Sequence, residues 1–470
     1  MKHEDILTAL EEISDMHIAE AEKPPKKRTF LKLVAAAAVI AIGVNLFSGP
    51  SLITAYAVTT PSEPRIMERP DIDAFGDREV WRLALDTWEA EQNSRIEVAI
   101  QAMSDLSSFF SDGNRQFLHT EQNENKIWSP VNAYIGLAMT AELTEGKTRQ
   151  QILDTFGVEN TDELRKQVSA VWESVYQDDS NEICVLANSL WLEKGLEYNK
   201  EAMNALGYHY YASVYQGDLG SNQTNKDIVA WIDNNTGKFL KDSTKNIQLD
   251  SDTIMALYST LYFQARWSSE FSEKNNTQGI FHMPDGETQT IYMNKKEANM
   301  DYYWGENFSA VQLSLTGNHQ MWLILPDEGS SPKDVLTQGD YYDLISAPGR
   351  WEQDKALTVN LSMPKFDVDS QQKLIPGLRA MGITDVFNQA AADFSSFTDA
   401  PVYAEDVQHA ARVVVDEEGV LAAAYTVMLA CGCAPSDNQE EIDFILDRPF
   451  LFAITGMDNL PLFAGVVAEP

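Results

Sequence analysis

The chain has 470 residues, 44% of them hydrophobic, and a formal net charge of −36. This length and apolar content allow one large domain with a substantial core and a short appendage, whereas the acidic balance argues against a nucleic-acid partner. The three cysteines, Cys184, Cys431 and Cys433, are too few for a disulfide framework, and no second ligand cluster accompanies the last two, so we predict neither a bound metal nor a cofactor.

The N-terminal region combines a basic cluster over 23–32 with an apolar run over 33–47. A cationic flank before an apolar core is typical of segments that enter or cross a membrane. Two interpretations stay open. The long amphipathic leader over 4–22 favours a retained single-helix anchor, whereas the small residues around Ala57 fit cleavage of a signal sequence after that residue. In either case we expect the rest of the chain to lie outside the cytoplasm.

Helical patterns follow a Pro-, Ser- and Thr-rich linker over 48–76. Apolar spacing predicts a helix from about 77 to 118, which Gly113–Asn114 is expected to interrupt. Ser129 as cap and Pro130 in the first turn predict the start of a second helix. A third helix is predicted over 146–156.

The second half of the chain changes to an alternating, β-rich pattern. Strands are predicted over 182–192, 256–267, 308–315, 321–327, 357–366 and 443–455, with a further β-rich segment at the C-terminus and a helix over 371–381. Helices first, then many long strands with few tight hairpins, predict an α+β fold with a large, mainly antiparallel sheet.

Eight short motifs, in order along the chain, resemble landmarks of the serpin family. They are Asn125–Pro130, Asn188–Trp191, Leu261–Trp267, Leu325–Asp327, Pro364–Phe366, Gly382–Phe387, Val407–Gly419 and Arg448–Phe452. The chain carries no nucleophile elbow, metalloprotease helix motif or phosphate loop, so we predict that it is not an enzyme.

The resemblance implies the serpin fold of a bacterial-type member. This is an α+β arrangement with about nine helices and three β-sheets around a large central sheet, and with an exposed reactive loop near the C-terminus. The implied organisation is a cytoplasmic tail over 1–29, a membrane or signal segment over 30–47, a linker with an extra helix over 48–94 and the serpin domain over 95–470.

The resemblance also implies a function, the inhibition of serine-type endopeptidases by a suicide substrate. A protease cleaves the reactive loop, and the N-terminal part of the loop then inserts into the central sheet as a new strand. The target, a serine protease or else a cysteine protease, stays attached as a covalent acyl complex with a monomeric inhibitor. The alternative is a serpin-fold protein that does not inhibit and serves in binding or surface interaction.

The loop sequence suits insertion. Val413–Glu418 is predicted to be a strand, and the resemblance places the hinge and inserting strand on Glu417, Gly419, Val420, Ala422, Ala423, Ala424 and Thr426. With a period of two, Val420, Ala422, Ala424 and Thr426 would share the buried face, where small uncharged side chains fit. Glycine gives the hinge its conformational freedom. Val420 departs from the Thr or Ser that is common in inhibitory members. It is apolar and of similar shape, so we expect insertion to survive, although this departure and the long loop support the alternative.

The family's loop geometry leaves two candidate bonds for cleavage. Counting from the hinge glycine gives Cys433–Ala434, which we favour because insertion geometry is set from the hinge. Counting back from Pro449 gives Asn438–Gln439, because the loop is longer than is common. Small and apolar residues near Cys433 suit proteases of the elastase, chymotrypsin or subtilisin type rather than the trypsin type.

Two further sites follow from the resemblance. Ser129, Asn132 and His409, with Ser259 nearby, would form a polar cluster, the shutter, beneath the opening of the central sheet. Such a cluster is either a satisfied buried hydrogen-bond network or a gate, and both interpretations stay open. Trp267 would lie at the breach, the point where the loop enters the sheet.

Overall fold

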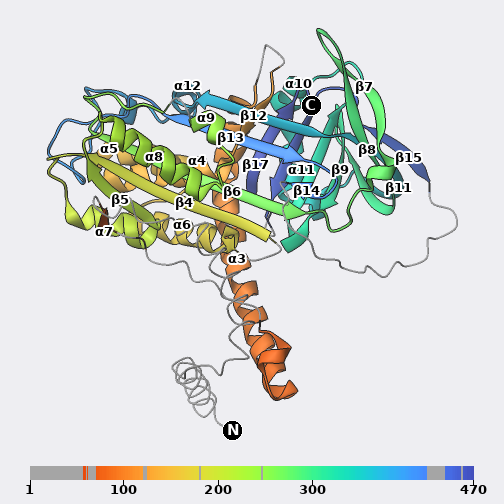
Figure 1. The fold of residues 1–470 in the computed structure, drawn as a ribbon, viewed down its shortest axis with the longest axis horizontal. Helices are drawn as coiled ribbons and strands as arrows, with labels where there is room; N and C mark the ends of the chain where they lie inside the picture. The colour runs from red at the N-terminus through yellow and green to blue at the C-terminus, as the bar shows by residue number, and fades with distance from the viewer. Residues whose placement is uncertain are drawn as a thin grey trace, which may run out of the picture. The chain divides into compact units, whose positions relative to one another are not determined.

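The helical and β-rich halves of the sequence fold into two β-sheets with helices packed against them (Figure 1). The computed structural model describes residues 57–59, 61, 70–119, 124–178, 182–244, 247–420, 440–456 and 459–470. The described residues confirm the predicted α+β class. No helix among them is long and apolar enough to cross a membrane. The apolar run over 33–47 lies outside the described residues.

The described part contains ten α-helices, most of them started by a polar cap. They are α3 (Arg78–Phe117), α4 (Pro130–Leu143), α5 (Gly146–Thr155), α6 (Thr161–Val175), α7 (Lys200–His209), α8 (Asn222–Asn235), α9 (Lys241–Thr244), α10 (Pro332–Gln338), α11 (Asp340–Ser346) and α12 (Ile375–Ala380). At the start of α4, the Ser129 side chain accepts a hydrogen bond from the backbone N–H of Asn132, as its sequence predicted.

The interruption predicted at Gly113–Asn114 is wrong, because α3 continues through both residues. A Cβ atom on residue 113 would lie 2.1 Å from the Trp128 ring, so the absent side chain makes room for the indole. Asn114 then accepts a hydrogen bond from Trp128 Nε1 at 2.7 Å. Gly113 and Asn114 therefore allow α3 to pack closely against Trp128 of the strand that follows it.

The central sheet is mainly antiparallel, as predicted, and its one parallel pair among the described strands is β4 with β5. Its order is β1 (Ala57–Thr59), β5 (Ala212–Gly217), β4 (Glu182–Glu193), β6 (Met255–Arg266), β14 (Gly419–Val420), β13 (Gln408–Val415) and β12 (Phe366–Lys373), with β3 (Gln177–Asp178) paired to β4. Chain segments far apart in sequence thus meet around β14.

Whereas the resemblance implied three β-sheets in all, the described strands outside the central sheet form a single second sheet. Its order is β15 (Glu441–Ile445), β11 (Asp354–Pro364), β8 (Gly286–Trp304), β9 (Phe308–Ser314), β10 (Gln320–Pro326), β16 (Phe450–Thr455), β17 (Pro461–Val467) and β2 (Lys126–Trp128), with β7 (Thr277–Met283) paired to β8. The 19-residue β8 pairs with β7 and β11 along most of its length and with β9 at its end. It therefore joins β7, β11 and β15 to the strands from β9 to β2.

Several element boundaries differ from the sequence prediction. The strand predicted over 357–366 is divided between β11, which ends at Pro364, and β12, which begins at Phe366. The strand predicted over 443–455 is two strands, β15 and β16, which have different neighbours. The helix predicted over 371–381 is limited to α12, since 371–373 continue β12 and pair with β13. Pro376, in the first turn of α12, is placed where its missing N–H is tolerated.

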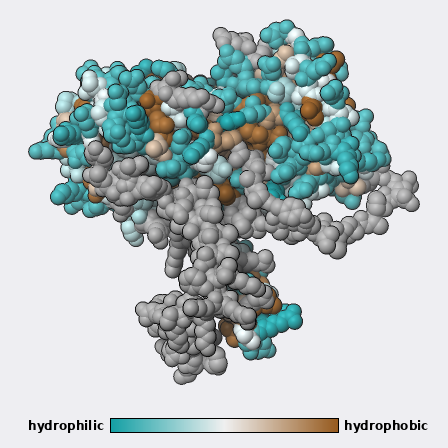
Figure 2. Space-filling view, viewed as in Figure 1, coloured by the Kyte–Doolittle hydropathy of each residue, from teal (hydrophilic) through white to brown (hydrophobic). Residues whose placement is uncertain are grey.

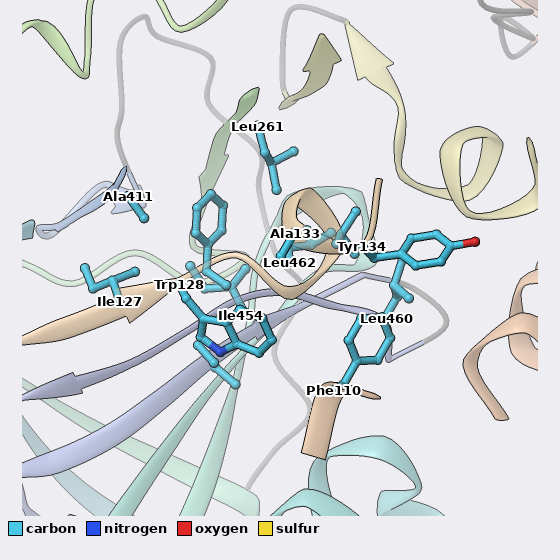
Figure 3. Close-up of a cluster of buried hydrophobic side chains, with 14 of the residues drawn as sticks. Phe110, Ile127, Trp128, Ala133, Tyr134, Leu261, Ala411, Ile454, Leu460 and Leu462 are labelled. Atoms are coloured by element: carbon cyan, nitrogen blue, oxygen red, sulfur yellow. The ribbon is translucent and has the colours of Figure 1, made fainter. Parts of the chain in front are cut away.

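The hydrophobic core beneath the central sheet determines where the site lies. Figure 3 shows Leu261 of β6, Ala411 of β13 and Ala133 of α4 in one cluster of buried side chains. Trp128 and Tyr134, both fully buried, extend the same cluster. Helix α4 therefore begins beneath the two strands that flank β14.

Candidate functional site: the opening of the central sheet

A tight turn carries the chain from β13 into β14. Asp416 Oδ1 accepts hydrogen bonds from the backbone N–H groups of Glu418 at 2.9 Å and Gly419 at 3.2 Å, and the Asp416 N–H donates to the Gly419 carbonyl at 3.1 Å. The prediction of a strand over Val413–Glu418 is therefore wrong for its last three residues. An Asp side chain that bonds the backbone two and three residues on favours a turn over a continued ladder.

Strand β14 lies between β6 and β13. Val420 pairs with Ala265 of β6 on one side and with Val415 of β13 on the other, and its side chain is 2% exposed. Residue 420 thus already occupies the position of an inserted strand. The valine that departs from the common Thr or Ser is accommodated in this position.

Gly419 is required by a close approach of two backbones. A Cβ atom on this residue would lie 2.3 Å from the Ala265 carbonyl oxygen and 2.7 Å from Arg266 Cα, both main-chain atoms of β6. From the sequence, Gly419 was expected to serve the hinge through its conformational freedom. The structure adds a steric reason, because β14 could not approach β6 with any side chain at this position.

Below β14, strands β6 and β13 border a narrow cleft. No ladder pairs these two strands with each other in the described part of the chain, where the sheet joins them through β14. The walls of the cleft are residues 259–263 of β6 and 410–414 of β13. Figure 2 shows hydrophobic surface at the centre of this face, where β13 and β14 lie in Figure 1. The two strands leave backbone groups available for a new neighbour.

The first turn of α4 is hydrogen-bonded to both walls of the cleft. The Ser129 N–H donates to His409 Nε2 on β13 at 2.9 Å. Asn132 Nδ2 donates to the Ser259 carbonyl on β6 at 3.1 Å, and the Ser259 hydroxyl donates back to Asn132 Oδ1. The structure thus brings together the three residues predicted for the shutter, and Ser259 joins them. These hydrogen bonds join β6 and β13 to the same end of α4.

Burial lowers the pKa of His409 to about 4. The imidazole accepts the Ser129 N–H, and only an unprotonated nitrogen can accept. Because the folded-state pKa lies below the ordinary value of 6.5, the unfolded chain takes up a proton first as the pH falls. The contribution of His409 to stability is complete above pH 6.5 and decreases as the pH falls towards 4.

We therefore expect the free energy of unfolding to decrease by about 2 kcal/mol between pH 7 and pH 5 because of His409 alone. Urea unfolding of the parent and of His409→Gln, whose amide oxygen can still accept, measures this difference. The variant should lose that part of the pH dependence. The matched control is exposed His282→Gln, which should keep it. Equal pH profiles for parent and His409→Gln would contradict the assignment.

Trp267, predicted at the breach, contacts the hinge turn directly. Its Nε1 donates to the Asp416 carbonyl at 2.8 Å, and its backbone N–H donates to the Glu418 carbonyl at 3.1 Å. The indole is 3% exposed and packs edge-on against Phe271, with ring centroids 5.6 Å apart. The Phe271 N–H donates to the Glu417 carbonyl at 3.1 Å. The turn is thus bound to the chain that follows β6.

Glu417 anchors the same turn through its side chain. Its buried carboxylate forms an ion pair with Lys365 at 2.6 Å and accepts a hydrogen bond from Asn276 Nδ2. Burial alone would raise the pKa of Glu417, but the hydrogen bonds from Lys365 and Asn276 outweigh it and lower the pKa below the ordinary value. Neither partner was predicted from the sequence, although Lys365 stands inside the Pro364–Phe366 motif.

Several predicted site residues lie outside the described residues. They are the inserting-strand residues Ala422, Ala423, Ala424 and Thr426 and the two candidate bonds, Cys433–Ala434 and Asn438–Gln439. The described residues include those predicted for the hinge, the shutter and the breach.

The described part of the central sheet thus has an opening: the hinge strand β14 lies between β6 and β13, which do not pair with each other, and a polar cluster beneath it bonds to both. The family model described as Serpin (serine protease inhibitor) matches residues 106–470. The chain belongs to the serpin family, and its fold is the predicted serpin fold.

Known proteins agree with this assignment. The chain is 29% identical to plasminogen activator inhibitor 1 of Bos taurus, over 76% of this chain and 89% of the relative. It is 26% identical to an uncharacterized serpin-like protein of Methanosarcina mazei, over 75% and 83%. The crystal structure of the thermophilic serpin Tengpin in the native state superposes with a TM-score of 0.68 at 24% identity, covering 78% of this chain and 93% of Tengpin.

Proposed function

We propose that this serpin inhibits serine proteases as a suicide substrate, by loop cleavage and insertion of the segment after Gly419 between β6 and β13. The observation that carries the proposal is the position of β14 between β6 and β13. Both residues of β14 pair with β6 and Val420 also pairs with β13, and the cleft continues in the direction that a longer inserted strand would take. Relatives named plasminogen activator inhibitor 1 and alpha-1-antiproteinase support the same class of activity.

Insertion has a physical driving force in this sheet. A strand of about a dozen residues that pairs on both sides gains many ladder hydrogen bonds, each worth roughly 1 kcal/mol net, against an ordering cost of similar size. Only a modest surplus is required. If the attached protease is distorted so that one oxyanion-hole donor is lost, deacylation slows roughly 10²- to 10³-fold, and the acyl-enzyme persists.

The target is proposed from the loop sequence. We propose cleavage at Cys433–Ala434, with Asn438–Gln439 as the alternative, by a protease of the elastase, chymotrypsin or subtilisin type. The product is a covalent acyl complex with a serine protease, or with a cysteine protease that uses the same acyl chemistry.

Incubation with one protease of each type, followed by denaturing electrophoresis, tests this function. We expect a complex that survives denaturation with at least one of them and not with a trypsin-type enzyme. Ala424→Arg places a charge on the proposed buried face, where its desolvation costs several kcal/mol, so this variant should be cleaved without complex formation. Clean loop cleavage of the parent, with neither complex nor a rise in thermal stability, would instead favour a non-inhibitory binding protein.

We further propose that a bacterial cell exports the serpin domain, which then lies outside the cytoplasm. The support is the basic flank over 23–32 and the apolar run over 33–47, with the cytoplasmic tail before it. A retained anchor leaves residue 1 on the cell-associated protein, whereas signal cleavage leaves Val58 as the first residue. N-terminal sequencing distinguishes the two, and a full-length chain in the soluble cytoplasmic fraction would contradict both.

A further inference from the structure

A short segment, Thr236–Leu240, crosses the outer side of the cleft between β6 and β13, and we name it the strap. It follows the end of α8, and three of its residues, Thr236, Phe239 and Leu240, line the cleft together with residues of both strands. The left-handed Gly237 and Lys238, with φ of 57° and 64°, turn the chain across the opening. The Lys238 N–H donates to the Asp233 carbonyl at 2.7 Å and the Phe239 N–H to that of Thr236 at 2.9 Å.

One part of the strap packs against β6. A Cβ atom on Gly237 would lie 3.2 Å from Cζ of the Tyr262 ring, tighter than an ordinary van der Waals contact. The backbone of the strap therefore lies directly against this ring. Tyr262 Oη donates to Gln264 Oε1 at 3.3 Å, so the ring is also held from its own strand.

The other part is held by Arg412 of β13. The guanidinium carbon lies 4.8 Å from the centroid of the Phe239 ring, and Nη1 donates to the Phe239 carbonyl at 3.3 Å. Asp367 of β12 fixes the guanidinium from the other side, by accepting from Nε at 2.8 Å and from Nη2 at 2.7 Å. A planar guanidinium can stack and bond in this way, whereas a lysine ammonium cannot.

We propose that Arg412 is a positioning residue for loop insertion, because it holds the strap closed over the cleft through Phe239. The proposal rests on the insertion step of the proposed function. A new strand needs about 4.7–4.9 Å on each side of it, so β6 and β13 must move apart along the cleft. The strap contacts Tyr262 on one wall and Arg412 on the other, and it cannot keep both contacts. Asp367 moves with Arg412 because β12 and β13 stay paired.

The test compares three variants with a matched control. Arg412→Met removes the stack and both sets of hydrogen bonds, Asp367→Asn weakens only the orientation of the guanidinium, and Arg412→Lys keeps the charge without the planar fork. The control is Arg379→Met. Arg379 stacks 5.9 Å from the ring centroid of Phe387 and donates to the Phe387 carbonyl at 3.3 Å, but both residues lie away from the cleft.

Two readouts follow the strap and the insertion separately. The rate of hydrogen exchange at the Lys238 and Phe239 amides in the uncleaved protein measures how readily the strap opens. The time course of the gain in thermal stability after loop cleavage with subtilisin reports insertion. We expect Arg412→Met to speed both about fivefold, consistent with loss of one partly exposed cation–π and hydrogen-bond contact. Asp367→Asn and Arg412→Lys should change both in the same direction by less, and Arg379→Met should change neither.

The outcomes separate this proposal from the proposed function. An unchanged insertion rate in Arg412→Met and Arg412→Lys overturns the role of Arg412, even if the strap exchanges faster. A parent that gains no stability after cleavage contradicts the proposed function itself. In that case only the hydrogen-exchange rate of the strap tests whether Arg412 holds it closed. Faster exchange in Arg412→Met than in Arg379→Met supports this role, and equal exchange refutes it. A general loss of protection across the core would show destabilisation rather than release of the strap, and would also count against the proposal.

Discussion

Gly419→Val is expected to abolish the stable protease complex and to leave a protein that is cleaved as a substrate. The Cβ atom would lie 2.3 Å from the Ala265 carbonyl oxygen. Since the clashing atoms belong to the backbone of β6, no side-chain rotation relieves the contact. β14 must then leave its place between β6 and β13, and insertion loses its starting point.

The expected loss of inhibition by Gly419→Val follows from the energetic cost of the steric clash. Such clashes cost about 1–3 kcal/mol, so the partition between trapping and substrate turnover should shift about 10- to 100-fold. Titration of a protease with parent and variant measures the number of inhibitor molecules consumed per enzyme inactivated. Gly349→Val is the matched control, because a Cβ atom there meets nothing within 4 Å. A Gly419→Val variant that traps protease as efficiently as the parent would show that β14 is not the start of insertion.

Local sequence signals predicted those features that local chemistry determines. Ser129 and Pro130 placed the start of α4 correctly, because a cap and a first-turn proline act within a few residues. The β-rich pattern predicted β6 and β10 to within two residues at their ends. In β10 the apolar run is continuous because residues 321–326 are buried on both faces of the sheet. The shutter residues Ser129 and His409 came from the family resemblance, and the structure brings them into contact.

Contacts between residues far apart in the chain could not be predicted from the sequence. Glu417 could be assigned to the hinge, but its pairing with Lys365 depends on how β12 follows β11 beneath the turn. The stack of Arg412 on Phe239 joins residues 173 positions apart. No periodicity encodes such pairs, because a period describes one element and these contacts join two. Gly113 illustrates the same limit, since a helix-breaking residue is tolerated where a distant indole needs its space.

Glu417→Lys is expected to destabilise the native state and to promote self-association. The substitution places two ammonium groups where one buried ion pair stands and removes the acceptor of Asn276. Loss of one partner of a buried pair costs about 3–5 kcal/mol, and we expect about 2–3 kcal/mol because Lys365 remains 34% exposed. With the turn released, β6 and β13 present unpaired strand edges that the loop of a second molecule can occupy.

Urea unfolding measures the loss of stability, and size-exclusion chromatography after mild heating measures the association. The charge-swapped double variant Glu417→Lys with Lys365→Glu is the control. It restores opposite charges across the same 2.6 Å contact, so it should recover part of the stability and most of the monomer. If the double variant is as unstable as Glu417→Lys alone, the hydrogen bond to Asn276 rather than the ion pair holds the hinge turn. If Glu417→Lys matches the parent in both measurements, neither contact restrains the opening of the sheet.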